Sequence, residues 1–148
     1  MTILERFMAY AQDFERTFHD DDWSRLAQYF APDATYEVRN VQTPCVLRGR
    51  DAIFRGIKKS LDGFDRKFAK RDIEVTNGPE ISDEGMRLGW KVVYSKTGLP
   101  PFVLRGQSSV RYANGKIAYL CDAYEPSVAV ELAAWRRESG VAIDPSYT

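Results

Sequence analysis

Apolar side chains recur along this chain at two spacings, which predict helices in one part of the sequence and strands in another. Residues 3–18 place an apolar side chain every three or four positions, as expected for a helix with one buried face; this stripe consists of Ile3, Phe7, Tyr10, Phe14 and Phe18. We expect further helices over residues 23–30, 51–64 and 128–138.

The strongest strand signal lies in residues 102–124. Two runs with alternating apolar positions, 102–112 and 116–124, flank the dipeptide Asn114-Gly115. Asn and Gly both tolerate positive φ, so this dipeptide between two such runs predicts a β-hairpin with a tight turn.

One carboxylate in this hairpin lies among apolar side chains. Side chains alternate along a strand, so Asp122 shares its side of the second strand with Ala118, Leu120 and Tyr124. A carboxylate in that setting either belongs to a functional site or is a structural acid with a partner. A salt bridge to Lys91 or to an arginine is the structural alternative.

The remaining pattern predicts an α+β fold in a single domain of residues 1–148. Helices come first and a run of antiparallel strands follows, so the helices should cover one face of the sheet. Further strands are expected over residues 34–39, 68–76 and 86–95, with a turn at 31–33, a break at 77–79 and a tail, 141–148, that is loose or packs on a neighbour.

The strand over residues 86–95 is apolar on both sides. Trp90 and Val92 lie on one side of it, whereas Val93 lies on the other side beside Lys91. A sheet with two apolar faces needs two covers. The helices supply one cover, and a second subunit is the simplest candidate for the other, so the sequence predicts a homodimer.

Composition limits the classes of partner. The chain has 21 Lys and Arg against 21 Asp and Glu, which gives a net charge of zero and no bulk attraction to nucleic acid or to an anionic membrane. No signal-peptide pattern or membrane-length apolar run occurs, so we expect a cytoplasmic protein with Cys45 and Cys121 as free thiols. No cluster has metal-ligand spacing, and no cofactor is expected.

Three strings in the chain resemble SnoaL-like proteins of the nuclear-transport-factor-2-like superfamily. They are DDDWSRLAQYFAPDATYEV, LRGRDAIFRGI and VRYANGKIAYLCDAYEP, and the resemblance extends over about residues 3–124. It implies a cone, in which a curved antiparallel sheet wraps around the N-terminal helices and encloses a pocket closed by the first helix. The family includes isomerases, cyclases, dehydratases, hydrolases and noncatalytic binding proteins, so the fold alone does not fix the function.

The catalytic patterns of this superfamily are mostly missing here. Phe14 stands where steroid isomerases of this fold have a donor tyrosine, and Val38 stands where they have the proton-abstracting aspartate. The paired histidines of the dehydratases are absent because the chain has only His19. The arginine and aspartate of the epoxide hydrolases fall near Gly89 and Lys91. What remains is Asp122, which matches the last-strand aspartate of epoxide hydrolases and of SnoaL-like cyclases.

The candidate site therefore centres on Asp122 as acid or base. Lys91 is expected either to lower the pKa of Asp122 as its partner or to bind a substrate oxyanion, provided that Lys91 rather than Trp90 faces the pocket; otherwise Lys91 is a solvated lysine. We expect the substrate to contact a set of mainly aromatic residues, namely Tyr10, Phe14, Trp23, Tyr36, Val38 and Tyr124, although core packing is the alternative for each of them.

The function predicted from these residues is cofactor-free acid–base chemistry on a small hydrophobic or cyclic molecule. Isomerisation, cyclisation, dehydration and hydrolysis all fit one aspartate. The alternative is a noncatalytic ligand-binding or dimeric scaffold protein of the same fold. A third class is a subunit that supports a larger oxygenase, since small subunits of ring-hydroxylating oxygenases share the fold.

Overall fold

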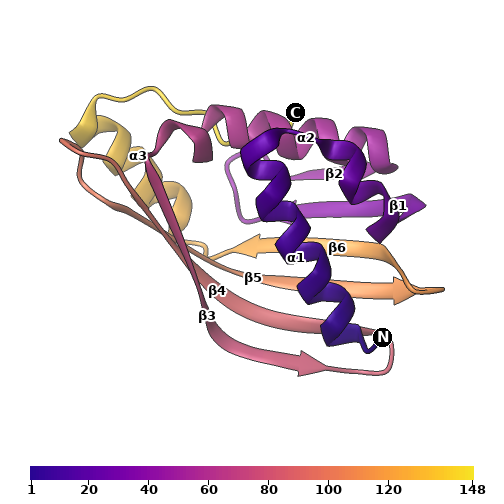
Figure 1. The fold of residues 1–148 in the computed structure, drawn as a ribbon. Coiled ribbons are helices and arrows are strands. Elements are labelled where there is room, and N and C mark those ends of the chain that lie inside the picture. Colours follow the sequence, from indigo (N-terminus) through magenta and orange to yellow (C-terminus); the bar gives the residue numbers. More distant parts are fainter.

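The computed structural model describes all residues from Met1 to Thr148. Most of the helical residues come before the long strands of the single sheet in the chain (Figure 1). In chain order the elements are α1 (Ile3–Asp20), η1 (Trp23–Tyr29), β1 (Phe30–Arg39), β2 (Cys45–Arg48), α2 (Arg50–Gly63), η2 (Asp65–Lys67), β3 (Lys70–Ile81), β4 (Gly85–Ser95), β5 (Phe102–Ala113), β6 (Lys116–Tyr124) and α3 (Val128–Ser139).

Local sequence signals set the bounds of α1. Thr2 accepts a hydrogen bond from the backbone N–H of Glu5, and the Glu5 carboxylate accepts one from the backbone N–H of Thr2. This reciprocal capping box satisfies two N–H groups that the first turn of a helix leaves unpaired. At the other end, Asp21 adopts a left-handed conformation with φ of 62°, which ends the helix two residues later than the apolar stripe predicts.

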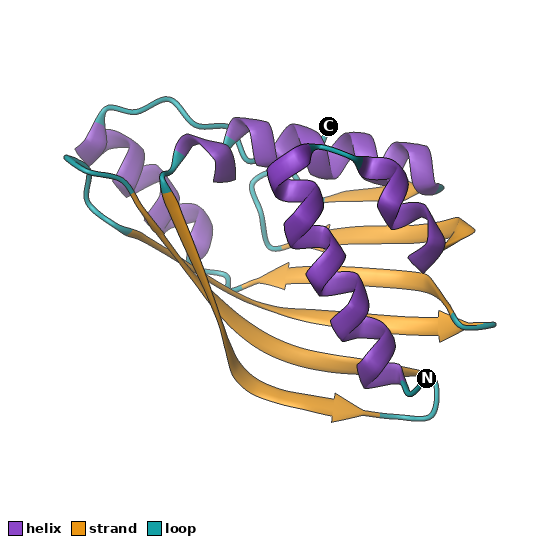
Figure 2. Ribbon diagram, viewed as in Figure 1, coloured by secondary structure: helices purple, strands orange, loops and turns teal.

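The sheet has six strands in the order β2-β1-β6-β5-β4-β3. The strands bend strongly, and α1 and α2 lie against the concave face of the sheet (Figure 2). All neighbouring strands are antiparallel except β1 and β6, which run parallel. The predicted α+β class and curved sheet are confirmed, but the sheet is mixed rather than wholly antiparallel as expected, because β1 and β6 run parallel.

The hairpin between β5 and β6 forms as predicted. Asn114 and Gly115 have φ values of 51° and 77°, and the strands on either side pair from Ala113 and Lys116 onward. Both turn residues therefore use the positive-φ region that this type of two-residue turn requires. The hairpin fixes which residues of β6 face the helices, and Asp122 is among them.

Two expected interruptions do not end strands. Residues 31–33 lie within β1, where the pairing with β6 shifts register between Phe30 and Thr35. Residues 77–79 lie within β3, where the pairing with β4 shifts register on either side of Asn77. Proline has no backbone N–H to donate. Because β3 is an edge strand, this missing donor can face the side of β3 that has no partner strand, and β3 continues past Pro79.

The prediction that the tail is loose or packs on a neighbour is wrong, because the tail packs on its own chain. Residues 141–148 return to α2, where the backbone N–H of Asp144 donates to the Gly63 carbonyl and the Ser60 hydroxyl donates to the Pro145 carbonyl. Ile143 is buried as a result. The tail thus forms part of the wall between α2 and the interior of the cone.

The core has two parts, which meet at the concave face of the sheet. One lies between α1, α2, β1 and β6 and is built around Tyr10, Leu26, Phe30 and Ile53. The other lies where α3 covers the ends of β4 and β5, around Phe64, Tyr94, Phe102 and Trp135. Between these two packed regions the helices and the sheet do not fill the interior completely.

Candidate functional site

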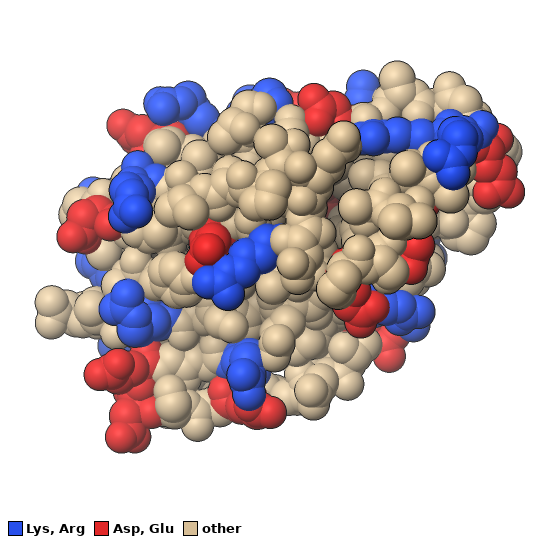
Figure 3. All heavy atoms as spheres, turned by 180° about the vertical axis from the view of Figure 1, so that it is seen from behind, with Lys and Arg blue, Asp and Glu red and all other residues tan.

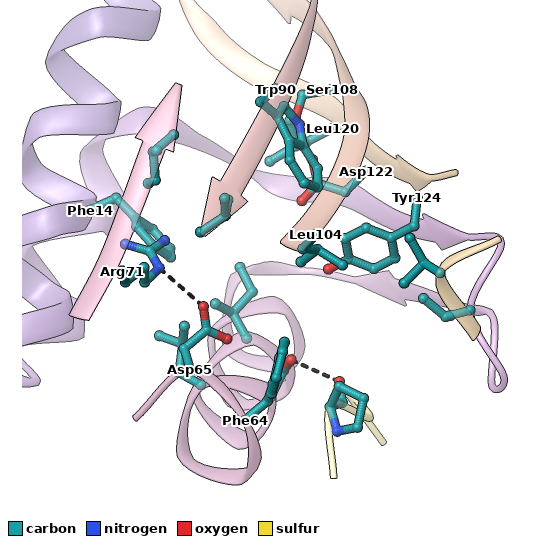
Figure 4. A pocket seen from close by; sticks show the side chains of 18 of the residues that line it. Phe14, Phe64, Asp65, Arg71, Trp90, Leu104, Ser108, Leu120, Asp122 and Tyr124 are labelled. Atoms are coloured by element: carbon teal, nitrogen blue, oxygen red, sulfur yellow. Dashed lines mark hydrogen bonds and ion pairs between the residues drawn. The ribbon is translucent and has the colours of Figure 1, made fainter. Parts of the chain in front are cut away.

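A cavity of about 430 Å³ occupies the concave side of the sheet. One wall is α1, and the opposite wall is the inner face of β3, β4, β5 and β6, with α2, α3 and the tail closing the far end. Most of the lining is apolar or aromatic, and its volume lies within the range of small-molecule sites. Figure 4 shows its lining side chains from close by.

Asp122 faces this cavity from β6 and has two neutral donors. The Tyr36 hydroxyl donates to Oδ2 at 2.5 Å, and the Ser108 hydroxyl donates to Oδ1 at 2.6 Å. These donors come from the strands on either side, since Val38 of β1 and Ser108 of β5 stand opposite Asp122 in the sheet. Each carboxylate oxygen keeps further acceptor capacity, because a carboxylate oxygen can take two hydrogen bonds.

Trp90 extends this arrangement to β4. Its indole N–H donates to the Ser108 oxygen at 2.8 Å, so a chain of hydrogen bonds runs from Trp90 through Ser108 to Asp122. Figure 4 shows these three side chains close together on one side of the cavity. The indole N–H occupies an acceptor site of the Ser108 oxygen. The Ser108 hydroxyl hydrogen therefore points away from the indole and toward Asp122.

Burial raises the pKa of the Asp122 carboxyl. The loss of water around the charged form is the largest cause, and the hydrogen bonds from Ser108 and Tyr36 oppose it. No cation contacts the carboxylate, so nothing offsets the cost of the charge except two neutral hydroxyl groups. The pKa of Tyr36 is raised well above its usual value, first by burial and then by the nearby Asp122 charge, so Tyr36 remains a donor.

The predicted partner of Asp122, Lys91, lies elsewhere. Trp90 lines the cavity, and side chains alternate along β4, so Lys91 lies on the outer face of the sheet. There its ammonium pairs with the Glu74 carboxylate at 3.4 Å. The expected Lys91–Asp122 pair is therefore wrong, and Lys91 does not line the cavity.

The other predicted contact residues divide into two groups. Tyr10, Phe14, Tyr36 and Tyr124 line the cavity. Trp23 and Val38 do not: Trp23 packs edge-on against Phe14 from behind, with ring centroids 6.4 Å apart, and Val38 is completely buried in the core. The aromatic wall thus comes from α1, β1 and β6 rather than from η1.

Tyr147 is a lining residue that the sequence analysis missed. It comes from the tail, and its hydroxyl forms a hydrogen bond of 2.8 Å with the hydroxyl of Tyr124. Its ring packs edge-on against Tyr36, with centroids 5.8 Å apart. Nothing in the short stretch of residues 141–148 shows a strand or helix pattern, so the position of Tyr147 depends on tertiary contacts, with α2 and with the tyrosines of β1 and β6.

A second buried carboxyl, Asp65, lies in another part of the cavity wall. Its Oδ2 accepts from the Tyr94 hydroxyl at 2.8 Å and from Arg71 Nε at 3.1 Å, and Arg71 also pairs with Glu15 of α1 at 2.8 Å. Burial raises the pKa of Asp65, and the Arg71 charge opposes that effect. Figure 4 shows Asp65 and Arg71 away from Asp122, and this cluster joins α1 to η2 and β3.

The mouth of the cavity lies between α1 and β3. Four apolar residues that line the cavity also remain at least one-third exposed, and they come from these two elements: Leu4, Met8, Ile73 and Val75. The same two elements are joined further along by the ion pair between Glu15 of α1 and Arg71 of β3, so the apolar part of the rim is the stretch that these four residues form. An apolar molecule could therefore enter along an apolar rim.

No set of three or more His, Cys, Asp or Glu side chains is placed to hold a metal ion, and Cys45 and Cys121 are free. None of the helices combines the length and the apolar character needed to span a bilayer.

The chain belongs to the SnoaL-like domain family. The model of that family matches residues 11–120, which include α1 from its middle onward and β6 as far as Leu120. The fold and the cavity at the concave face of the sheet are those implied by the resemblance. No curated protein matches this chain in sequence.

Solved structures with the same nuclear-transport-factor-2-like fold are similar to nearly the whole chain. A Bacillus subtilis protein provisionally assigned as an isomerase has 16% identity and a TM-score of 0.67, over 97% of this chain and 100% of that one. A Xanthomonas campestris protein provisionally assigned as a polyketide cyclase has 22% identity and a TM-score of 0.56, over 90% and 98%. TerC, co-crystallised with polyporic acid, has 14% identity and a TM-score of 0.63, over 91% and 98%. At these identities the likeness concerns the fold.

Proposed function

We propose that the protein is a small-molecule enzyme that uses Asp122 as an acid–base group on a hydrophobic cyclic compound bound in the cavity. The observation that carries this proposal is the position of Asp122. It is a carboxyl with a raised pKa that faces an apolar cavity, and it has hydroxyl donors but no cation. A carboxyl whose pKa is raised by burial and that faces a ligand cavity is suited to exchange a proton with a bound molecule.

The family and its neighbours support the class of ligand. The SnoaL-like family contains enzymes and binders of small molecules, and one neighbour of the same fold is described as a polyketide cyclase. The apolar lining favours a compound with a ring system, and the partly apolar mouth favours one that enters with little charge. Proton transfer at a carbon next to a carbonyl group is the simplest reaction that one carboxylate can carry out on such a compound.

The test is hydrogen exchange in deuterated water. A thermal-shift screen of cyclic ketones, lactones and phenols selects compounds that stabilise the protein, and NMR then follows replacement of hydrogen by deuterium at carbons next to the carbonyl group. The wild type should accelerate this exchange. Asp122→Asn should fold and bind but lose at least a hundredfold of the acceleration, because general acid–base groups contribute roughly 10²–10⁴-fold.

A matched control is Asp83→Asn, which removes an exposed carboxylate in the loop between β3 and β4. This control should exchange hydrogen at the wild-type rate. Full exchange activity in Asp122→Asn would exclude Asp122 from the reaction.

The second candidate is a noncatalytic ligand-binding protein. Two observations favour it. Both oxygens of Asp122 already accept a hydrogen bond. Phe14 and Val38 stand at the positions that match the donor tyrosine and the proton-abstracting aspartate of steroid isomerases. Under this alternative, Asp122→Asn changes ligand affinity, and neither protein accelerates exchange.

We also propose a homodimer formed through the outer face of the sheet. Val93 and Val103 are partly exposed on this face, with Lys91 and Arg105 beside them and Glu74 across from Lys91. Figure 3, which views the molecule from behind, shows mainly uncharged atoms with charges of both signs scattered between them. A surface that carries both signs around an apolar centre can be complementary to a second copy of itself across a two-fold axis.

A further inference from the structure

The tail reaches the cavity because α2 offers it a surface without side chains. A Cβ atom at Gly63 would stand 2.0 Å from the Asp144 carbonyl oxygen, and one at Gly56 would stand 3.0 Å from the Tyr147 carbonyl oxygen. Only glycine fits such close approaches of two backbones. Ser60 lies between them and donates to the Pro145 carbonyl at 2.8 Å. The helix is thus shaped to hold the tail against it.

Polar contacts further along α2 hold the end of the tail. The Lys59 ammonium donates to the Ser146 hydroxyl and to the Thr148 carbonyl, both at 2.7 Å. These contacts stand on either side of Tyr147, whose side chain therefore points away from Lys59 and into the cavity. These contacts hold the Tyr147 phenol in one defined position in the cavity.

The hydroxyl groups of Tyr124 and Tyr147 form a pair in which one of the two O–H hydrogens is not used by their mutual hydrogen bond. Two hydroxyl groups bring two hydrogens, and their mutual hydrogen bond of 2.8 Å uses one of them. The nearest other hydroxyl is that of Tyr36, which lies close to Tyr147 but already donates its own hydrogen to Asp122, and no hydrogen bond of ordinary geometry joins Tyr36 to Tyr147. An O–H group of the pair that faces the mainly apolar cavity without a well-placed acceptor is costly, and a bound molecule can supply that acceptor.

The pair stands next to the Asp122 carboxylate. Tyr124 follows Asp122 by two residues on β6, so both side chains lie on the same face of the sheet. The Tyr147 ring packs against Tyr36, the residue whose hydroxyl donates to Asp122. An acceptor atom held by the hydroxyl pair would therefore belong to the same ligand that contacts Asp122.

We propose that the hydroxyl pair of Tyr124 and Tyr147 binds a carbonyl oxygen of the ligand, so that the tail is part of the binding site. The ligand class is then narrower than the hydrophobic cyclic compounds of the proposed function: it is a fused-ring ketone or a related carbonyl compound. This inference rests on the proposed function, because it takes the cavity as the ligand site. Both hydroxyl groups stay protonated at neutral pH, since burial raises the pKa of Tyr147 to about 12 and holds the pKa of Tyr124 well above its usual value.

The experiment compares two bicyclic compounds of nearly the same shape, 2-tetralone and tetralin, of which only the first has a carbonyl group. Calorimetric titration measures the affinity of each for the wild type and for the double variant Tyr124→Phe/Tyr147→Phe. The double variant removes both hydroxyl groups together, so no hydroxyl is left without its partner and the fold should be retained. Tyr112→Phe is the matched control, because it removes a buried hydroxyl that does not line the cavity.

The wild type and the Tyr112→Phe control should bind 2-tetralone roughly 3–10-fold more tightly than tetralin, the preference expected from one added hydrogen bond. The double variant should lose this preference and bind 2-tetralone no more tightly than tetralin, with its tetralin affinity unchanged. A double variant that keeps the wild-type preference would overturn the inference and leave the proposed function standing. Failure of the wild type to bind either compound would instead overturn the cavity as a site for bicyclic ligands, and the inference with it.

Discussion

At the scale of single residues, the cavity wall holds two buried carboxyl groups in different settings. Asp65 contacts the guanidinium group of Arg71, whereas Asp122 contacts only the hydroxyl groups of Tyr36 and Ser108. A buried carboxylate beside a cation is a structural ion pair that is strongly destabilised when one partner is removed. A buried carboxyl beside neutral donors can gain or lose a proton more readily, and that difference separates a structural acid from a candidate reactive one.

The raised pKa of Asp122 predicts how its contribution to stability varies with pH. The folded state holds the proton more tightly than the unfolded state, whose pKa is near the ordinary value of 3.8. The folded protein therefore binds more protons between 3.8 and the raised pKa, and its free energy of unfolding falls as the pH rises through that window. Asp122→Asn removes this loss, so the stability of the variant relative to the wild type should increase with pH from about 4 upward.

Urea unfolding at a series of pH values measures the difference between the two proteins. Taking the difference cancels the contribution of Asp65, which is the same in both. A relative stability that decreases as the pH rises would mean that the folded state favours the charged form of Asp122, as it would with a hidden cationic partner.

At the scale of elements, a glycine on β5 lets the Asp122 arrangement assemble. Gly106 stands between Trp90 on β4 and Tyr124 on β6, and those two rings meet edge-on with centroids 5.6 Å apart. A Cβ atom at Gly106 would lie 2.7 Å from the Trp90 ring and 2.8 Å from the Ala123 carbonyl oxygen. The missing side chain thus makes room for the indole that donates to Ser108.

Gly106→Ala should accordingly destabilise the protein by about 1–3 kcal/mol, the usual cost of overpacking, and should displace Trp90 from Ser108. Chemical denaturation measures the free energy of unfolding. Combining the change with Trp90→Phe, which deletes the clashing ring atoms, should recover part of the loss, so the two substitutions should not be additive. Strict additivity would show that the clash with the Ala123 backbone, rather than with the indole, determines the cost.

The sequence predicts those elements whose signals are local. The apolar stripe of α1 and the Asn114-Gly115 turn each depend on residues close together in the chain, and both appear as expected. The choice between Trp90 and Lys91 as the inward residue could not be made, because β4 carries apolar residues on both of its faces. Asp65 and Tyr147 were missed for a related reason: a polar residue after a helix and a tyrosine in an irregular tail acquire their roles only from distant partners, Arg71 and Tyr124.

At the scale of the whole molecule, the two faces of the sheet differ in what covers them. The concave face forms the cavity with the helices, and the outer face is covered by no element of the chain (Figures 2 and 3). Residues such as Val93 and Val103 pair across β4 and β5 on that outer face. The proposed dimer would cover them without changing the cavity, so assembly and ligand binding should be separable by mutation.

The variant Val103→Glu tests this separation. Sedimentation velocity at micromolar concentration should show a dimer for the wild type and a monomer for Val103→Glu, because a carboxylate at the centre of an apolar interface loses its water without gaining a partner. Val130→Glu, on the exposed side of α3, is the matched control and should remain a dimer. A wild-type protein that sediments as a monomer contradicts the proposed dimer.

The parallel pairing of β1 with β6 also governs the order in which the protein can be built. The hydrogen bond from Tyr36 to Asp122 joins residues 86 positions apart, whereas β3 to β6 pair with their neighbours in the chain. Contacts between distant residues form slowly, because closing a long loop costs entropy before the contact repays it. During synthesis, β1 therefore stays unpaired on its β6 side until β6 has left the ribosome. The surroundings of Asp122 form among the final steps of folding.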